Sequence, residues 1–276
     1  MDVSVIIVNY NTTQLIIDCI ETIYEHTKDV NFEIIVVDNN SPNRSIEKLN
    51  DIFPYVKLIL NDKNSGFGAA NNLGNKYAIG KYLFLLNSDT LLISNAIFDF
   101  FQFMEKKPDA GICGGNLLTK DLQPNMSFLR IKPSLLVKIN ELFFGLILRF
   151  IYIDNWSFAH QEQVLEINGF VSGADFFVKK ALFDQVGGFD EDFFMYFEEV
   201  ELTHRIEKLN YKSFILPSVK IIHLEGGSTF TENKANWQRE SQKLYFQKTK
   251  QKYYKAVVVV DKLINFKKKL KNSIKR

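Results

Sequence analysis

The sequence predicts an α/β fold, in which helices flank a mostly parallel central sheet. Two observations predict it. Over the first hundred residues short apolar runs alternate with stretches of helical length, and each apolar run ends in polar residues. Strands and helices that alternate in this way form right-handed βαβ units. With 276 residues, of which 46% are hydrophobic, the chain is long enough for one continuous domain with a substantial core.

The expected elements of the first half follow one another along the chain. Short apolar runs predict strands at Val3–Val8, Phe32–Val37, Val56–Leu60 and Tyr82–Leu86. Helices are expected at about Gln14–Tyr24, Ser45–Ile52 and Gly68–Ala78, with Pro42 near the first turn of the second. Strands this apolar are typical of a parallel sheet that is covered on both faces.

After Pro108 the alternation breaks down. Residues 116–165 are poorly periodic, apart from an expected amphipathic helix at Leu135–Ile151, and order returns from Phe170. The elements expected there are a strand at Phe176–Val178, helices at Ala181–Val186 and Glu199–Leu209, and strands near Ser213–Leu216 and Lys220–His223. We therefore expect one domain over residues 1–250, whose second half (108–250) extends the sheet of the first (1–107).

Composition and charge exclude several classes of function. The net charge of +2 argues against a general polyanion binder, and the globular part lacks the basic face of a nucleic-acid-binding protein. Cys19 and Cys113 lie outside any metal or redox spacing, which fits a reducing, cytoplasmic compartment. No signal peptide is expected, because the apolar run after Met1 is too short. No uninterrupted apolar stretch reaches membrane-spanning length.

Polar residues follow all four expected strands of the first half. These strand ends are Asn9-Tyr10-Asn11, Asp38-Asn39-Asn40-Ser41, Asn61-Asp62 and Asn87-Ser88-Asp89. Ligands of open parallel sheets bind beyond the carboxyl ends of the strands. Four polar ends on one edge therefore predict a site, although a solvated turn in which Ser88 and Asp89 cap the following helix would explain the last one alone.

The segment Gly66-Phe67-Gly68 resembles the start of a dinucleotide-binding fingerprint, in which glycines let the backbone approach a phosphate. That fingerprint belongs after the first strand, and Asn71 stands in place of its third glycine. An NAD-binding site is therefore disfavoured. Two interpretations stay open: the glycines contact a ligand, or they begin a helix that packs tightly on the sheet.

Side chains that could take part in a reaction are most concentrated around Glu198 and Glu199, at the expected start of a helix. The helix dipole alone explains acidic residues in a first turn. It does not explain the aromatic residues before them, Phe193, Phe194, Tyr196 and Phe197. Burial among such rings would raise the pKa of a carboxyl group, as a general base requires. His223 lies at another strand end, where a lone histidine is more often structural than a ligand.

Taken together, these pieces resemble the family 2 glycosyltransferases, which are inverting enzymes with a GT-A fold, and within them the rhamnosyltransferase-like group. The resemblance covers residues 3 to about 250 and rests on six segments in the expected order. They are VSVIIVNYN, IIVVDNNS, NSGFGAANNLG, LFLLNSDT, the long segment from GADFFVKK to EKLNYK, and IIHLEGGS. The expected fold is thus a GT-A domain, with a nucleotide-sugar-binding half followed by an acceptor and catalytic half.

The resemblance also implies a donor site. The residues it places at the nucleotide and donor sugar are Asn9, Tyr10, Asn11, Asp38, Asn64, Gly66, Asn71, Asn87, Ser88 and Asp89. Asp38 would hold the nucleobase or ribose. In the family the fourth-strand motif is an Asp-X-Asp-type metal site, and here Asn87 replaces the first acid. Asp89 therefore carries most of the metal charge, with His223 as a further ligand of Mn²⁺ or Mg²⁺.

The same resemblance implies the catalytic groups and the reaction. Glu199 takes the position of the general base, and Glu198 and Asp175 lie on the acceptor side. The acceptor, a glycan or lipid-linked glycan of a cell-surface polysaccharide, would receive a sugar from a nucleotide-sugar donor. Rhamnose is the first candidate, and galactose, glucose and N-acetylated sugars are the others.

Two other functions are compatible with a nucleotide-binding α/β sheet. A nucleotidyltransferase would need a glycine-rich loop with a Lys or Arg after the first strand, and Asn-Tyr-Asn-Thr-Thr carries no positive charge. A non-catalytic protein that binds sugar nucleotides in a degenerate site stays open.

The C-terminal tail, 251–276, is basic and amphipathic. From Lys248 to Arg276 the chain has eleven Lys or Arg residues and one acid, Asp261. Apolar residues interleave with these lysines, which predicts peripheral binding to an anionic membrane at the inner face of the cell membrane. A solvated basic helix that packs on the domain is the alternative.

Overall fold

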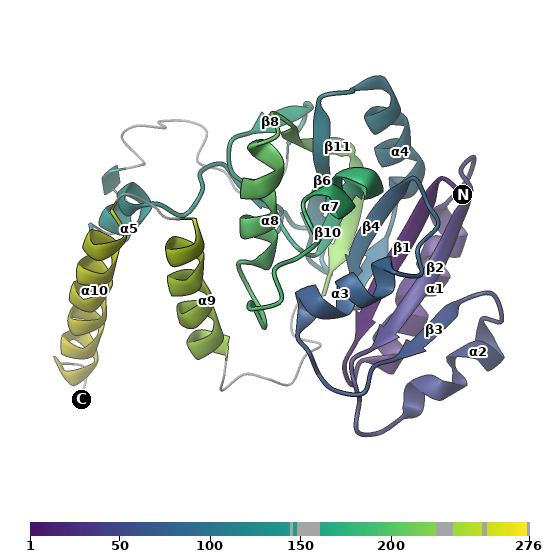
Figure 1. Cartoon of the computed structure of the whole chain (residues 1–276), viewed down its shortest axis with the longest axis horizontal. Helices are drawn as coiled ribbons and strands as arrows, with labels where there is room; N and C mark the ends of the chain where they lie inside the picture. Colours follow the sequence, from purple (N-terminus) through teal and green to yellow (C-terminus); the bar gives the residue numbers. More distant parts are fainter. Residues whose placement is uncertain (144–145, 148–160, 225–233, 250–252, 275–276) are drawn as a thin grey trace.

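A computed structural model of the chain describes residues 1–143, 146–147, 161–224, 234–249 and 253–274 (Figure 1). Its centre is a nine-stranded sheet. The strands follow one another across it in the order β3 (Lys57–Leu60), β2 (Phe32–Asp38), β1 (Val3–Asn9), β4 (Tyr82–Asn87), β10 (Asp175–Lys179), β6 (Ala110–Leu118), β11 (Lys212–His223) and β5 (Thr90–Leu92), and β8 (Leu165–Ile167) pairs with β11. A separate two-stranded sheet joins β7 (Phe128–Leu129) to β9 (Phe170–Val171).

The sheet is parallel from β3 to β4, and the β6–β11 pair is parallel too. The register aligns Asn9 with Asp38 and Val8 with Asn87, so the polar strand ends meet on one edge. Strand β10 lies between β4 and β6 and runs antiparallel to both. Its first residue, Asp175, pairs with Leu86, near the polar edge.

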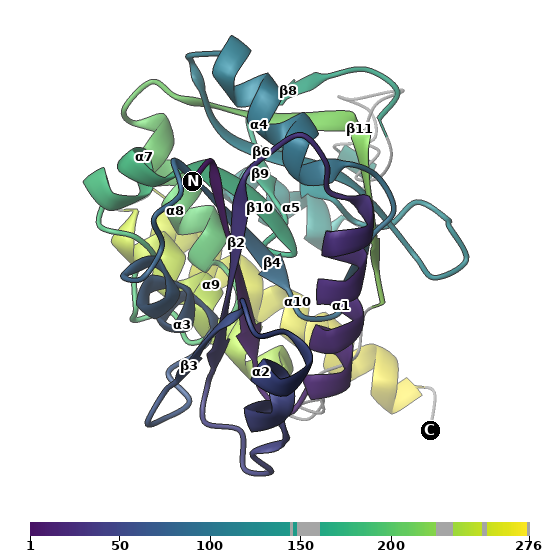
Figure 2. The ribbon, with the colours of Figure 1, turned by 90° about the vertical axis from the view of Figure 1, so that its right-hand side faces the viewer.

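Helices cover both faces of the sheet (Figure 2). On one face lie α1 (Thr13–His26) and α4 (Ala96–Lys106), and on the other lie α3 (Phe67–Asn75), α7 (Lys180–Gln185) and α8 (Glu198–Glu207). The alternation of strand side chains divides the core accordingly: Val5 and Ile7 pack with the first group, and Ile6 with the second. The short elements η1 (Ser45–Lys48) and α2 (Leu49–Ile52) lie between β2 and β3.

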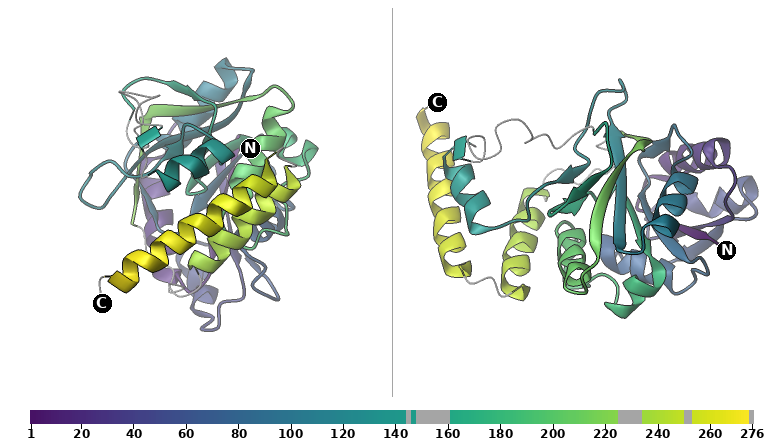
Figure 3. Two further views of the ribbon diagram at one scale, coloured as in Figure 1. Left: turned by 90° about the vertical axis from the view of Figure 1, so that its left-hand side faces the viewer. Right: turned by 90° about the horizontal axis from the view of Figure 1, so that it is seen from above.

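Three helices form one end of the molecule (Figure 3). They are α5 (Leu135–Leu142), α9 (Lys234–Lys248) and α10 (Tyr254–Ile274). Helix α10 buries Val257 and Ile264, and its Asp261 pairs with Lys138 of α5 at 2.8 Å. No helix in the described ranges is long and apolar enough to cross a membrane.

The structure confirms the predicted mostly parallel α/β sheet and its extension by the second half of the chain. Two expectations were wrong. The two strands predicted near residues 213–216 and 220–223 form the single strand β11, with a register shift between Leu216 and Lys220. Residues 110–118, in part assigned to the poorly periodic stretch, form the fully buried strand β6. The helix expected at Leu135–Ile151 begins as α5, and residues 148–160 lie outside the described part.

Candidate active site

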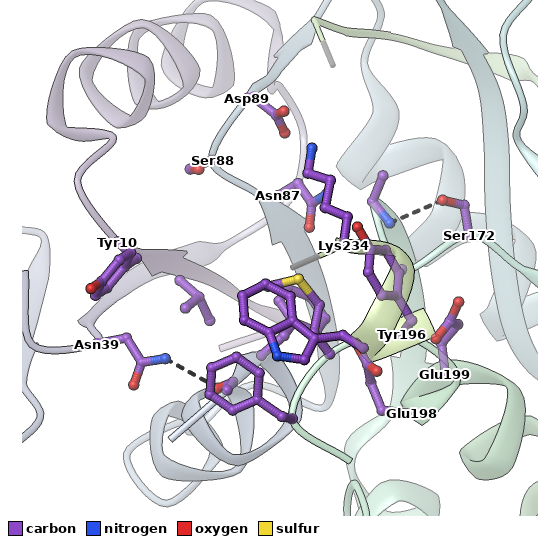
Figure 4. Close-up of a pocket in the computed structure, with 18 of the residues that line it drawn as sticks. Tyr10, Asn39, Asn87, Ser88, Asp89, Ser172, Tyr196, Glu198, Glu199 and Lys234 are labelled. Carbon is purple, nitrogen blue, oxygen red and sulfur yellow. Dashed lines mark hydrogen bonds between the residues drawn. The ribbon is translucent and has the colours of Figure 1, made fainter. Parts of the chain in front are cut away.

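A cavity of about 440 Å³ opens at the polar edge of the sheet (Figure 4). Residues from both halves of the chain line it. The ends of β1 and β4, the segment before β10, the end of β11, the start of α8 and the start of α9 all contribute. The cavity is therefore where the sequence predicted a site, beyond the carboxyl ends of the parallel strands.

The ends of β1 and β2 are joined by a buried hydrogen-bond network. The Asn9 amide donates to Asp38 Oδ1 at 2.6 Å and to Ser41 Oγ at 3.1 Å. Asp38 also accepts hydrogen bonds from the backbone N–H and the hydroxyl of Ser41, at 2.9 and 2.6 Å. The N–H of Asn11 donates to Ser41 Oγ at 2.9 Å. Asn9, Asn11 and Asp38 are not among the described residues that line the cavity, so their contacts in this structure serve the shape of the strand ends.

Asn39 lines the cavity and organises the loop on its far side. Its amide donates to Asn64 Oδ1 at 2.8 Å and to the carbonyl of Gly66 at 3.2 Å. Its own Oδ1 accepts from Asn61 at 3.0 Å. Asn64 and Gly66, which the resemblance places at the donor, line the cavity, whereas Asn71 is buried and donates to the carbonyl of Phe67.

The fourth strand places its polar end directly in the cavity. Asn87, Ser88 and Asp89 line it, as does Tyr10 across from them. Ser88 Oγ accepts a hydrogen bond from the hydroxyl of Thr12 at 3.0 Å. The polar break that follows β4 thus lies at the cavity. It does not cap a helix, because strand β5 follows it and α4 begins only after Asn95.

Asp89 and His223 lie side by side, because β11 pairs with β5 and aligns His223 with Thr90. His223 Nε2 is 3.3 Å from Asp89 Oδ1, and both side chains are about five-sixths buried, with 16% and 15% exposed. One carboxylate and one imidazole fit a divalent cation of the Mn²⁺ type. Within the described ranges, no three or more His, Cys, Asp or Glu side chains lie together in a way that could hold a metal ion.

Glu198 and Glu199 open α8 and both line the cavity. The two residues before them, Tyr196 and Phe197, each have a φ of 69°, in the left-handed region that bulky residues rarely adopt. Such a conformation costs about 1–3 kcal/mol per residue and is found mostly at functional sites. The carbonyl of Phe197 accepts from the N–H of Glu201 at 2.9 Å, so the strained turn runs directly into the helix.

Burial raises the pKa of both carboxyl groups. The pKa of Glu199 is raised to about 7, chiefly by burial. Burial and then the neighbouring charge of Glu199 raise the pKa of Glu198 well above its usual value. Glu198 Oε2 is buried and has no hydrogen-bond partner among the described residues. Near neutral pH, Glu199 can therefore take up and release a proton, as a general base does.

The loop that carries these acids is fastened to the start of α3. The N–H of Phe67 donates to the carbonyl of Phe194 at 3.0 Å. Gly66 has a φ of 87°, and a Cβ at this position would overlap the carbonyl oxygen of Phe194. Gly66 therefore permits close backbone packing, and it also lines the cavity, where contact with a ligand stays a prediction.

Asp175 does not lie among the described lining residues, although it was expected on the acceptor side. It is fully buried in β10, where its Oδ2 accepts from the N–H of Gly115 at 2.6 Å. Burial raises the pKa of its carboxyl group well above the usual value. The residues just before it, Ser172 to Ala174, line the cavity instead.

Helix α9 contributes two lining residues that sequence reasoning missed, Lys234 and Trp237. The Trp237 ring lies 5.1 Å from that of Phe194, centroid to centroid. Neither residue belongs to a pattern that marks a site in the sequence, since α9 is a polar helix with many lysines and glutamines. Only the folded chain brings them to the cavity.

Comparison with known proteins shows similarity over most of the chain. The model of the glycosyl transferase family 2 matches residues 4–162. The N-acetylglucosaminyl-diphospho-decaprenol L-rhamnosyltransferase of Mycobacterium tuberculosis is 28% identical over 211 residues, which cover 71% of this chain and 67% of that protein. Glycosyltransferase GlyG of Streptococcus pneumoniae is 32% identical over 123 residues, which cover 43% of this chain and 40% of that protein.

Solved structures share the fold at low sequence identity. The mannosyltransferase PcManGT from Pyrobaculum calidifontis, in complex with GDP-Man and Mn²⁺, matches with a TM-score of 0.63 and 15% identity, over 95% of this chain and 69% of that one. S. aureus TarS 1-349 matches with a TM-score of 0.58 and 17% identity, over 89% of this chain and 64% of that one. The chain thus spans about two thirds of the length of these relatives.

Proposed function

Because the chain belongs to glycosyl transferase family 2 and has the GT-A fold, we propose that it moves a sugar from a nucleoside-diphosphate-sugar to a hydroxyl group of a glycan or lipid-linked glycan, with inversion of the anomeric carbon. One observation carries the proposal. A single cavity holds the Asp89–His223 pair and the Glu198–Glu199 pair, whose carboxyl pKa values are raised. Inverting transfer needs charge stabilisation at the leaving group and a base at the acceptor.

In the proposed reaction Asp89 and His223 hold a divalent cation, Mn²⁺ or Mg²⁺. When bound, that cation would supply positive charge at the donor diphosphate. The donor would lie along the strand ends, beside Tyr10, Asn39 and Asn87, with its sugar toward α8.

Glu199 acts as the base. The oxygen of the acceptor hydroxyl forms a bond to the anomeric carbon while the bond from that carbon to the diphosphate oxygen breaks. The electron pair of the broken bond leaves with the nucleoside diphosphate, and Glu199 takes the hydroxyl proton. The pKa of the Glu198 carboxyl group is raised as well, by burial and by the charge of Glu199, and Glu198 lies beside the base without taking the proton.

Similarity to an L-rhamnosyltransferase that acts on a decaprenol-linked sugar supports rhamnose as the first candidate donor sugar and a lipid-linked acceptor. Such a reaction would serve the assembly of a cell-surface polysaccharide. The family match also favours glycosyl transfer over nucleotidyl transfer.

A panel of nucleotide-sugars tests the proposal. The purified chain is incubated with each donor and Mn²⁺, and release of nucleoside diphosphate is measured, with dTDP-rhamnose first. We expect hydrolysis or transfer with one donor class and none after removal of Mn²⁺ by chelation. Release of pyrophosphate from a nucleoside triphosphate and a sugar 1-phosphate, with formation of a nucleotide-sugar, would contradict the proposal and favour a nucleotidyltransferase. No release of nucleoside diphosphate from any donor would contradict it and favour a non-catalytic binding protein.

We also propose that α10 attaches the protein to anionic lipid at the inner face of the cell membrane. The side of α10 opposite Val257 and Ile264 exposes Val259 (57%) and Leu263 (49%), with the exposed Lys255 and Lys262 beside them. Apolar residues between lysines suit the boundary of a bilayer, where each lysine contributes about 1 kcal/mol. Asp261 pairs with Lys138 on the packed side, so its charge lies away from this surface.

Liposome co-sedimentation tests the attachment without deleting the packed helix. The double variant Val259→Asp, Leu263→Asp should pellet less than the wild type with vesicles that contain phosphatidylglycerol. The matched control is Ile79→Asp, Leu122→Asp, two residues that are exposed to a similar degree elsewhere. Equal pelleting of the two double variants would contradict the attachment.

A further inference from the structure

The acidic side chains of the cavity outnumber its basic ones. Asp89, Glu198 and Glu199 line it, and of the described lining residues only Lys234 is a lysine or arginine. A nucleoside diphosphate is itself an anion and would enter next to these carboxyl groups. Cationic groups are therefore favoured at the diphosphate, and besides the proposed divalent cation Lys234 is the one lysine or arginine that the described lining supplies.

The Lys234 side chain is directed into this space. Figure 4 shows it extended into the cavity, with its ammonium group toward Asn87 and Asp89. It is partly buried and, within the described ranges, makes no hydrogen bond or ion pair. A lysine that only solubilised the helix would point to solvent, as Lys243 of the same helix does.

Helix α9 is held in place by contacts further along its length. Ser241 Oγ donates to the carbonyl of Met195 at 2.8 Å. Lys248 Nζ lies 2.5 Å from a carboxylate oxygen of both Asp190 and Asp192. Tyr245 is fully buried against Phe197. These contacts fix α9 to the loop that precedes Glu198, so the first turn of the helix has a defined place at the cavity.

We propose that Lys234 binds the diphosphate of the donor and stabilises the negative charge that develops on the departing nucleoside diphosphate. This inference rests on the proposed donor class. As the bond between the anomeric carbon and the diphosphate oxygen breaks, its electron pair moves onto that oxygen, and the ammonium of Lys234 faces the growing charge. Lys234 takes no part in the proton transfer, because the acceptor proton goes to Glu199. Its contribution is electrostatic and is largest when the charge has formed.

Binding measurements separate this role from a structural one. The affinities of dTDP, UDP and GDP, and of the matching monophosphates, are measured by calorimetry in the presence of Mn²⁺. The variants are Lys234→Met and Lys234→Arg, with Lys243→Met as the matched control on the same helix. For the nucleoside whose diphosphate binds best, Lys234→Met should lower the affinity for the diphosphate about ten- to a hundredfold. The affinity for the monophosphate should fall far less. Lys234→Arg should restore most of the affinity, and Lys243→Met should leave it unchanged.

The possible outcomes separate the role of Lys234 from the proposed donor class. Unchanged diphosphate affinity in Lys234→Met, or an equal loss for the diphosphate and the monophosphate, overturns the inference and leaves the donor proposal intact. Failure of the wild-type protein to bind any of the three diphosphates overturns the donor class, and the inference with it. With a donor identified, Lys234→Met should also lower kcat as well as raise KM, since charge on the leaving group is greatest in the transition state.

Discussion

The two sides of the cavity differ in how well their polar groups and backbone are satisfied. At the strand-end side, Asn9, Asp38 and Ser41 satisfy one another in a buried network. At the helix side, the chain enters α8 through two residues in the left-handed region, and a buried carboxylate oxygen of Glu198 has no partner among the described residues. The strand-end side has the satisfied hydrogen bonds of a stable protein interior. The helix side has a strained backbone and a buried oxygen without a described partner, both of which are rare in such an interior.

This difference indicates where recognition and reaction take place. Satisfied networks keep strand ends rigid, which suits the binding of a donor of fixed shape. Strain and raised pKa values concentrate at sites that perform chemistry. We therefore expect substitutions on the helix side to change rate, and substitutions in the buried network on the strand-end side to change stability.

The largest effect is expected for Glu199→Gln. This change keeps the size of the side chain and removes its basicity, so turnover should fall by about 10²–10⁴-fold while donor affinity is retained. Steady-state transfer kinetics together with calorimetry of donor binding measure both. Glu198→Gln is the neighbouring control and should reduce turnover less. Near-wild-type transfer by Glu199→Gln would show that the base lies elsewhere.

The pH profile provides a second test of the helix side. Because the pKa of Glu199 is raised to about 7 and the base must be ionised, kcat/KM should fall about tenfold per pH unit below 7. Ionisation is disfavoured in the folded state, so stability should decline as the pH rises from the ordinary carboxyl pKa of 4.5 to about 7 and level off above that. Glu199→Gln should therefore raise the melting temperature at pH 8 and leave it nearly unchanged at pH 4. A melting temperature of Glu199→Gln below that of the wild type at pH 8 would contradict this prediction.

Asp89→Ala tests whether the Asp89–His223 pair holds a cation. Without its only carboxylate this pair cannot hold a hard divalent ion, so affinity for dTDP, or for the diphosphate that binds best, should drop to the level measured without Mn²⁺. Far-ultraviolet circular dichroism should stay unchanged, because Asp89 follows a strand and is not in the core. Retention of the full Mn²⁺ effect would rule the pair out as a metal site.

The smallest effect on rate, and a clear effect on stability, is expected for Asp38→Ala. The change removes the acceptor for Asn9 and Ser41 and leaves buried donors unpaired, at a cost of roughly 1–3 kcal/mol in the free energy of unfolding. Urea denaturation measures it. A loss of nucleotide affinity with unchanged stability would instead support the nucleobase or ribose contact that the family resemblance implies.

The strand-end side was predictable from sequence because its signals are local. An apolar run followed by polar residues marks where each strand leaves the core, and parallel pairing brings those ends together. The acidic pair of α8 was predictable for the same reason, since the aromatic residues directly before it indicate burial.

The remainder depended on packing that no local pattern records. Strand β6 was missed because Gly114 and Gly115 interrupt it. Their missing side chains make room for Val171 and Val219, which approach from other elements. Lys234 and Trp237 reach the cavity only because α9 packs on the loop before α8. The buried position of Asp175 could not be predicted for a similar reason, since its hydrogen-bond partner is the backbone of Gly115 in the neighbouring strand.

The reversed direction of β10 has a consequence for how the protein can tolerate changes of chain length. Strand β10 runs antiparallel to its neighbours, so the chain passes the cavity as it enters this strand. It leaves the strand at Lys179, which pairs with Tyr82 at the amino end of β4. Residues inserted before Asp175 would alter the shape of the cavity. Residues inserted at Gly187, which is exposed and has open space around it, would lengthen a turn after α7 that contributes no lining residue among those described. Variation of loop length in related chains should therefore change substrate choice at the first place. At the second it should act on stability, because Arg205 of α8 donates to the carbonyls of Val186 and Gly188 on either side of Gly187.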